Sequence, residues 1–174
     1  MTLAKDIKEN QVLLVLVPGS KYSLMSMNVA KNLSKKKVLF VTLNKTVGAL
    51  KESFTKKKVD FSNFFFIDAI TSSITSTAPK APDCKFISSP SALSELSLGI
   101  TKQLTKDYDY LIFDSLTNLL IYQGKSPVAK FVSLIVNKIR AKKTKALFYA
   151  LEMNQHQELI QEAEMFMDKV TNYK

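Results

Sequence analysis

The sequence is poor in the residues that build disulfides and metal clusters. Cys84 is the only cysteine and His156 the only histidine among the 174 residues. An internal disulfide and a cysteine metal cluster are therefore excluded. A zinc site with several histidines is excluded as well, and a Cys–His nucleophile pair would require these two residues to meet in space. We expect Cys84 to be a small, partly buried hydrophobic residue and His156 an exposed helix residue.

Long apolar runs are also missing. No segment reaches the ~18 consecutive apolar residues of a membrane-spanning helix. The N-terminal segment MTLAKDIKEN is polar, unlike the apolar region of a signal peptide. We therefore expect a cytoplasmic protein without a membrane span. Its 174 residues predict one domain, residues 1–174, long enough to bury a sizeable core.

Acidic residues are in deficit, and arginine is nearly absent. The chain has 25 Lys and Arg residues against 15 Asp and Glu, a net charge of +10, and Arg140 is its sole arginine. Such a charge is compatible with a nucleic-acid or acidic-membrane partner. We favour solvated helix ends instead, because the lysines fall in separate runs at 35–37, 56–58 and 142–145. Arginine, the better ligand for bases and phosphates, is scarce, tryptophan is absent, and no aromatic residues interleave with the lysine runs.

What the sequence does contain is an alternation of short apolar runs and amphipathic segments. This pattern predicts strands buried on both faces of a mostly parallel sheet, with helices on each side. The expected fold class is α/β, a doubly wound, three-layer α/β/α structure. The expected strands are residues 12–17, 38–43, 64–67, 85–88, 110–114 and 145–151, and the expected helices are residues 22–35, 46–58, 90–105, 126–142 and 155–167.

Local signals refine these expectations. Pro90 and Pro127 each follow a serine and are expected near the first position of a helix. Residues 71–83, TSSITSTAPKAPD, show no hydrophobic period and predict a flexible exposed loop, either a spacer or a lid or partner-contact loop. In the helix 126–142, the spacing predicts a core-facing side made of Val128, Phe131, Leu134, Ile135 and Ile139.

The most informative segment is residues 11–33, QVLLVLVPGSKYSLMSMNVAKNL. An apolar run predicts a buried strand, Pro18-Gly19-Ser20 interrupts it, and an amphipathic helix follows. Strand, tight turn and helix form the arrangement in which backbone N–H groups and a helix N-terminus bind phosphate. The apolar side of this helix is expected to contain Leu24, Met27, Ala30 and Leu33.

The turn lacks residues that a phosphate-binding loop needs. A functional loop reads GxxxxGK[ST], and an ungapped alignment places Lys21 at the second glycine, Tyr22 at the lysine and Ser23 at the magnesium-binding hydroxyl. Tyr22 cannot supply the lysine's cation to the phosphates, and Lys21 would do so only from a rearranged loop. Ser23 either ligates Mg²⁺ or caps the helix. The candidate nucleotide-binding residues are Gly19, Ser20, Lys21, Tyr22 and Ser23.

Four segments, in this order and spacing, resemble the RecA-like ATPases of the KaiC type, in particular the small archaeal KaiC-like proteins. They are the turn at 17–23, VLFVTLNK at 38–45, FFFIDAIT at 64–71 and YDYLIFDSLTNLLIY at 108–122. Residues 86–104 and 165–170 are similar to that group as well. The resemblance implies a doubly wound sheet with the nucleotide site at the carboxyl ends of its strands.

The resemblance also implies roles for single residues. Asp114 occupies the Walker B position, where it either holds Mg²⁺ through water or accepts hydrogen bonds from Ser115, Thr117 or Ser23. Asn44 falls at the position of the catalytic glutamate, and an amide cannot take a proton from an attacking water. Glu152 follows the last expected strand, where the family often has polar sensing residues; otherwise it is an exposed acid before a helix.

The sequence therefore favours a catalytically degenerate RecA/KaiC-like protein with no catalytic residues of its own and lost or weak ATP binding. It would act as a regulatory or assembly module with a paralogous ATPase or with copies of itself. One alternative is a switch that binds Mg-ATP or ADP through Ser23 and Asp114 without efficient hydrolysis. Others are a nucleic-acid-binding protein of the recombinase-paralogue type and an ATPase completed by a neighbouring subunit.

Overall fold

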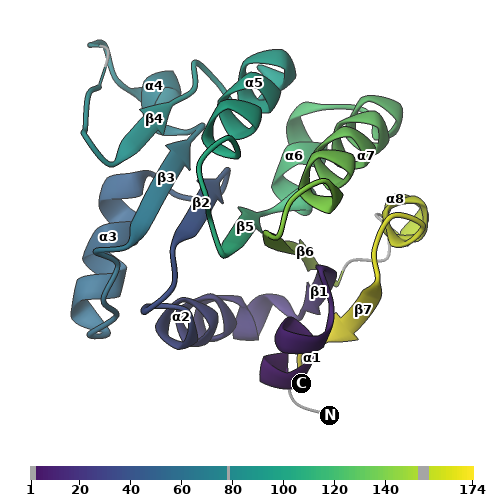
Figure 1. The fold of residues 1–174 in the computed structure, drawn as a ribbon. Helices are drawn as coiled ribbons and strands as arrows, with labels where there is room; N and C mark the ends of the chain where they lie inside the picture. The colour runs from purple at the N-terminus through teal and green to yellow at the C-terminus, as the bar shows by residue number, and fades with distance from the viewer. Residues whose placement is uncertain (1–2, 78, 153–156) are drawn as a thin grey trace.

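The fold is built on a parallel β-sheet between two layers of helices (Figure 1). The computed structural model describes residues 3–77, 79–152 and 157–174. Over these residues the sheet has seven strands in the order β4-β3-β2-β5-β6-β1-β7, and every neighbouring pair is parallel. The strands are β1 (Val12–Val17), β2 (Val38–Thr42), β3 (Phe64–Asp68), β4 (Cys84–Phe86), β5 (Tyr110–Asp114), β6 (Lys145–Leu151) and β7 (Lys169–Asn172).

Helices cover both faces of this sheet, which confirms the expected three-layer α/β/α fold. One face packs against α1 (Leu3–Glu9), α2 (Tyr22–Asn32) and α3 (Val47–Lys56). The other packs against α5 (Leu93–Gln103), α6 (Leu116–Tyr122), α7 (Lys125–Arg140) and α8 (Gln157–Glu164). Within the described ranges, no helix combines the length and the apolar character needed to cross a lipid bilayer.

Apart from their end residues, the central strands are largely apolar, because both of their faces are buried. In β2, Leu39 and Val41 belong to the core beneath α5–α8, whereas Val38 and Phe40 belong to the core beneath α1–α3. Successive strand residues point to opposite faces, so a strand covered on both sides needs apolar residues at every position. Phe54 of α3 packs edge-on against Phe40, with ring centroids 5.9 Å apart.

Besides a short helix inside residues 71–83, three further described helices and strands were not predicted. They are α1, α6 and β7, all short and partly polar. β7 adds to the sheet beside β1 at its edge, and it is joined to α1 through Asp6, which accepts hydrogen bonds from Lys169 Nζ at 2.5 Å and Thr171 Oγ1 at 2.8 Å. Elements of this length depend on tertiary contacts rather than on propensity, so their sequences carry little signal.

Residues 71–83, expected to be a flexible exposed loop, have local structure near both ends. Residues Thr71–Ile74 form a short helix, α4. The Asp68 carboxylate fixes its start by accepting hydrogen bonds from the Ile70 and Thr71 backbone N–H groups at 2.7 and 2.9 Å. At the other end, Ala81 forms an isolated β-bridge with Cys84. Hydrogen bonds to Asp68 thus hold the start of this segment, although its composition is typical of loops.

One helix boundary and one strand also differ from expectation. The predicted strand 85–88 is β4, one residue earlier, and α5 begins at Leu93, so Pro90 lies in the preceding turn rather than in the helix. Residues 153–156 lie outside the described residues, and with them His156 and the start of the expected helix 155–167.

Two leucines expected in the core are exposed. Leu24 is 58% exposed and Leu134 is 43% exposed. In each helix the adjacent residue, Met25 or Ile135, is fully buried. Successive helical residues are ~100° apart around the helix axis. A small error in the predicted direction of the buried face therefore assigns a leucine at its border to the core when it lies in solvent.

Candidate functional site

The candidate site lies at the carboxyl edge of the sheet, where the turn after β1 meets the ends of β2 and β5. A pocket of about 180 Å³ opens there. The structure brings five predicted site residues to its wall, whereas Ser20 and Lys21 do not line it. The described lining residues are Gly19, Tyr22, Ser23, Ser26, Met27, Asn44, Lys45, Leu50 and Asp114.

The turn after β1 is a single 3₁₀ turn. Residues Gly19–Lys21 form it, the Lys21 N–H donates to the Pro18 carbonyl at 2.9 Å, and α2 begins at Tyr22. The strand before it stays paired through Val17, which is in register with Leu151. When the GxxxxGK[ST] motif is aligned without gaps, its first glycine falls on Leu16. Leu16 lies within β1 and pairs with β6 on one side and with β7 on the other. Backbone that a phosphate-binding loop would wrap around its ligand is here held in a strand and a tight turn.

Tyr22 directly contacts the buried carboxylate at the end of β5. Its hydroxyl donates a hydrogen bond to Oδ1 of Asp114, a residue only 4% exposed. The Tyr22 ring also packs edge-on against Tyr149, with ring centroids 6.3 Å apart and an interplanar angle of 88°. Tyr149 lies on β6, which separates β1 from β5. Tyr22 therefore reaches over the intervening strand to close one side of the pocket.

Burial and hydrogen bonding set the protonation of this pair. Burial raises the pKa of the Asp114 carboxyl to about 6, although the hydrogen bond from Tyr22, the charge of Lys45 and the Asn44 side chain act in the opposite direction. Burial, with the Asp114 carboxylate beside it, raises the pKa of the Tyr22 phenol far above its usual value. At neutral pH the phenol is thus a stable donor and the carboxylate its acceptor.

Of the donors that the sequence suggested for Asp114, Ser115 and Thr117 bond elsewhere. Ser115 Oγ accepts the Asn118 N–H at 3.2 Å and caps α6. Thr117 Oγ1 accepts the Leu151 N–H at 2.8 Å. Ser23 is an exposed residue in the first turn of α2, whose N-cap is Lys21, and among the described contacts its side chain neither caps the helix nor reaches Asp114. The donor that sequence reasoning missed is Tyr22, which was considered only as a lost lysine.

A second buried carboxylate stands one strand away. Asp68, at the end of β3, is fully buried and pairs in register with Thr42, which also pairs with Asp114. Its oxygens accept the Val47 N–H at 2.6 Å, at the start of α3, in addition to their bonds to α4. Asp68 therefore joins the beginnings of two helices to the sheet, and this structural role was not predicted.

The residues present fit Mg²⁺ poorly. This ion binds carboxylate, phosphate and water oxygens in a strict octahedron. One oxygen of Asp114 already accepts the Tyr22 hydroxyl, and the described residues contain no group of three or more His, Cys, Asp or Glu side chains placed to hold a metal.

Cys84 is buried, as expected, and burial raises the pKa of its thiol to about 12. Glu152 is exposed, and its backbone N–H donates to the Val17 carbonyl at 3.1 Å.

Sheet order and helix layers define an α/β protein with the fold of the KaiC-like RecA group. The chain belongs to a family of unknown function, DUF7504, whose sequence profile matches residues 13–173. A solved structure with this fold is the KaiC-like protein of the hyperthermophilic archaeon Pyrococcus horikoshii OT3, with a TM-score of 0.65 and 10% sequence identity over 92% of this chain and 69% of that one. At this identity the likeness shows the fold alone. A search of the curated proteins finds none that matches the chain.

Proposed function

We propose that this protein is a catalytically inactive RecA/KaiC-like module, a single cytoplasmic domain that acts through contacts with a partner protein. The observation that carries the proposal is the hydrogen bond from Tyr22 to Asp114. In a working site of this kind, a lysine cation and a metal-bound acid face the phosphates. Here the side chain at the lysine position is neutral, and it binds the acid instead of a ligand.

Other features of the pocket support the loss of hydrolysis. Asn44 lines the pocket at the position of the catalytic base, and an amide does not accept a proton from water at neutral pH. Lys21 is exposed and does not line the pocket, so it is not placed to replace the missing cation. The catalytic base and the cation of the turn are thus both replaced, and the cation that does line the pocket, Lys45, follows β2.

The second candidate is a nucleotide switch without efficient hydrolysis. The observation that favours it is the pocket itself, since Ser23, Lys45 and Asp114 all line about 180 Å³ of open space. A phosphate would be attracted by Lys45, and it would have to displace the Tyr22 ring from Asp114. Binding of ATP or ADP would then break the Tyr22–Asp114 hydrogen bond and shift the start of α2.

ATP turnover and thermal unfolding with millimolar Mg-ATP or Mg-ADP test both candidates. An inactive module shows no turnover above that of Asp114→Ala and no thermal shift, although a ligand at 100 times its Kd would add ~2.7 kcal/mol of stability. Turnover that disappears in Asp114→Ala would contradict the proposal. A thermal shift without turnover, increased in Tyr22→Ala, would instead support the switch.

The partner class is tested separately. We propose either a paralogous ATPase or further copies of this chain. Sedimentation equilibrium distinguishes them, because self-association at micromolar concentration indicates copies of the chain. A monomer over the same range points to a different protein as the partner.

A further inference from the structure

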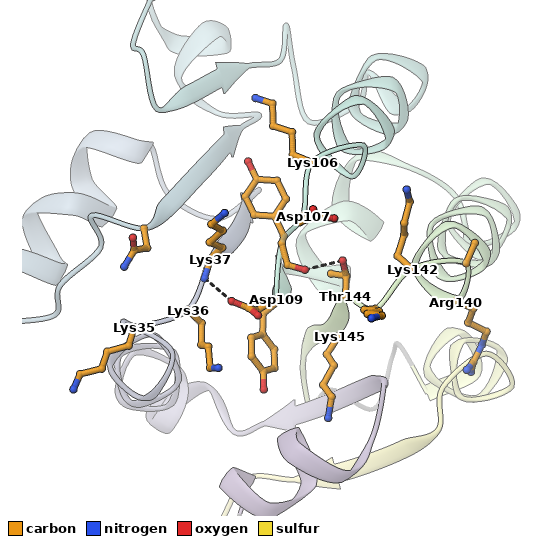
Figure 2. A pocket seen from close by; sticks show the side chains of 15 residues that line it. Lys35, Lys36, Lys37, Lys106, Asp107, Asp109, Arg140, Lys142, Thr144 and Lys145 are labelled. Atoms are coloured by element: carbon orange, nitrogen blue, oxygen red, sulfur yellow. Dashed lines mark hydrogen bonds between the residues drawn. The ribbon is translucent and has the colours of Figure 1, made fainter.

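A large groove lies at the opposite, amino-terminal edge of the sheet (Figure 2). Its volume is about 1080 Å³, and residues 35–37, 106–110 and 140–145 supply most of its walls. These segments follow α2, α5 and α7 and lead into β2, β5 and β6. Parallel strands begin at the same edge of a sheet, so the fold brings together three segments that are far apart in the sequence.

The groove is strongly basic. Seven lysines and Arg140 line it, against two acids, Asp107 and Asp109. Arg140 pairs with Asp168 at 2.8 Å, and the Lys145 ammonium group donates to the Lys8 carbonyl. Lys35, Lys36, Lys37, Lys142 and Lys143 are exposed, and among the described contacts their ammonium groups have no hydrogen-bond or ion-pair partner.

The acids inside the groove do not neutralise these lysines. Asp109 accepts the Lys37 backbone N–H at 2.9 Å, so its carboxylate fixes the loop before β2 rather than pairing with an ammonium group. Lysines at the ends of α2 and α7 complement the helix dipoles. That effect is confined to the last turn of each helix, and it does not account for a shared hollow lined by eight cationic groups.

Aromatic side chains stand between the lysine runs, contrary to the sequence expectation. Tyr108 and Tyr110 both line the groove and are partly exposed. The Tyr108 hydroxyl donates to Gln103 Oε1 at 3.1 Å, which fixes the ring beside the groove. Their proximity to residues 35–37 and 142–145 arises from strand order. Partly exposed tyrosine rings among lysines are the side chains on which unpaired bases stack.

We propose that this groove binds the phosphate backbone of nucleic acid without reading its sequence. Lysine ammonium groups act as point charges on phosphates, whereas base readout depends on the fork of arginine, which occurs here once and is paired. The groove is concave, and among the described residues no large exposed hydrophobic side chain, such as Ile74, Leu98 or Met165, lines it. Insertion into a lipid surface is therefore not favoured at this edge. The groove lies at the amino-terminal edge of the sheet, whereas Asp114 lies at the carboxyl edge. The inference about nucleic acid is therefore independent of the proposed loss of ATP hydrolysis.

Fluorescence anisotropy with labelled single-stranded and duplex oligonucleotides of unrelated sequences tests this inference, at about 50 mM and about 200 mM salt. The groove variant is Lys36→Glu with Lys142→Glu and Lys143→Glu. Its matched control is Lys80→Glu with Lys102→Glu and Lys130→Glu, which makes the same change in charge at exposed lysines outside the groove. Circular dichroism checks that both variants are folded.

We expect the wild type to bind with a Kd of ~10⁻⁶ M or higher. This Kd should change little with oligonucleotide sequence and should rise with salt concentration. The groove variant should bind at least tenfold more weakly, and its slope of log K against log salt on single strands should fall by ~2, for three lost phosphate contacts. The control should keep most of its affinity. The form of oligonucleotide that binds more tightly, single-stranded or duplex, identifies which form of nucleic acid supplies the phosphates.

Three outcomes would overturn the inference. One is no binding at the lower salt concentration. Another is an equal loss in the groove variant and the control, which would indicate net charge rather than a site. The third is groove-dependent binding to phosphatidylserine vesicles that is tighter than binding to either oligonucleotide, which would assign the groove to a membrane surface.

Discussion

The hydroxyl of Tyr22 donates a hydrogen bond to the carboxylate of Asp114, and the two residues are 92 positions apart in the chain. One stands at the first residue of α2 and the other at the last residue of β5. Their contact joins the start of α2 to the end of β5 as a single internal pair. The site is thereby stabilised without a ligand.

The first prediction concerns the stability that this pair provides. Tyr22→Phe removes the donor and leaves a buried carboxylate without it, which should lower the free energy of unfolding by ~1–3 kcal/mol at pH 7. Urea denaturation measures the change. Tyr122→Phe is the matched control, since Tyr122 is 47% exposed, and it should change stability by less than ~0.5 kcal/mol. Equal losses in the two variants would contradict the role given to Tyr22.

The second prediction is a pH dependence with a defined sign. The pKa of Asp114 is about 6 in the folded protein, above its ordinary value of 3.8, so the folded state binds the proton more tightly than the unfolded state. The contribution of Asp114 to stability is therefore full below pH 3.8 and is lost as pH rises through about 6, by ~3 kcal/mol at most.

Asp114→Asn removes this titration. The free energy of unfolding of the wild type, relative to that of Asp114→Asn, should fall across this pH window and level off above it. A difference that is constant with pH, or that rises, would show that the folded-state pKa is not raised. Urea titrations at a series of pH values supply the measurement.

The third prediction concerns Asp68. Asp68→Asn replaces one acceptor oxygen by an amide that cannot accept the Val47 N–H or the Thr71 hydroxyl. Because hydrogen bonds to a buried charged group are worth ~1.5–3 kcal/mol each, we expect a loss of at least ~2 kcal/mol in urea denaturation. Asp60→Asn is the control, since Asp60 is exposed and its described hydrogen bonds are confined to Ser62. Similar effects of the two substitutions would argue against Asp68 as the residue that anchors α3 and α4.

The fourth prediction concerns the edge strand β7. Its attachment to α1 depends on Asp6, whose pKa is lowered mainly by the hydrogen bond from Lys169. Asp6→Asn should increase amide hydrogen exchange in Lys169–Asn172 more than in the central strands. Glu9→Gln, at an exposed residue of the same helix that pairs with Lys5, should not.

The contribution of Asp6 to stability changes with pH in the opposite direction to that of Asp114. Because the folded pKa of Asp6 is depressed, its contribution is present above the ordinary pKa of the carboxyl and is lost as pH falls through the lowered value. Exchange in β7 should therefore rise, relative to the central strands, at acid pH in the wild type but not in Asp6→Asn. An unchanged pattern in both proteins would exclude this role for Asp6.

Much of the layer structure could be predicted from the sequence. The strands β1, β2, β3, β5 and β6 lie within one residue of their expected ranges, because a strand buried on both faces must be apolar throughout. By contrast, α6 and β7 were missed, since short elements are formed by their neighbours more than by their own residues. The position of Asp114 at a strand end was predicted, but its partner was not.

The sequence by itself determined the alternation of buried strands and amphipathic helices, and it showed that residues 16–23 depart from the GxxxxGK[ST] pattern. Only the tertiary structure decided that Tyr22 binds Asp114 and that the lysines at 35–37 and 142–145 share one groove. Both results depend on the order of strands in the sheet, with β6 between β1 and β5 and β5 between β2 and β6. That order is set by packing among residues far apart in the chain, which local periodicity does not encode.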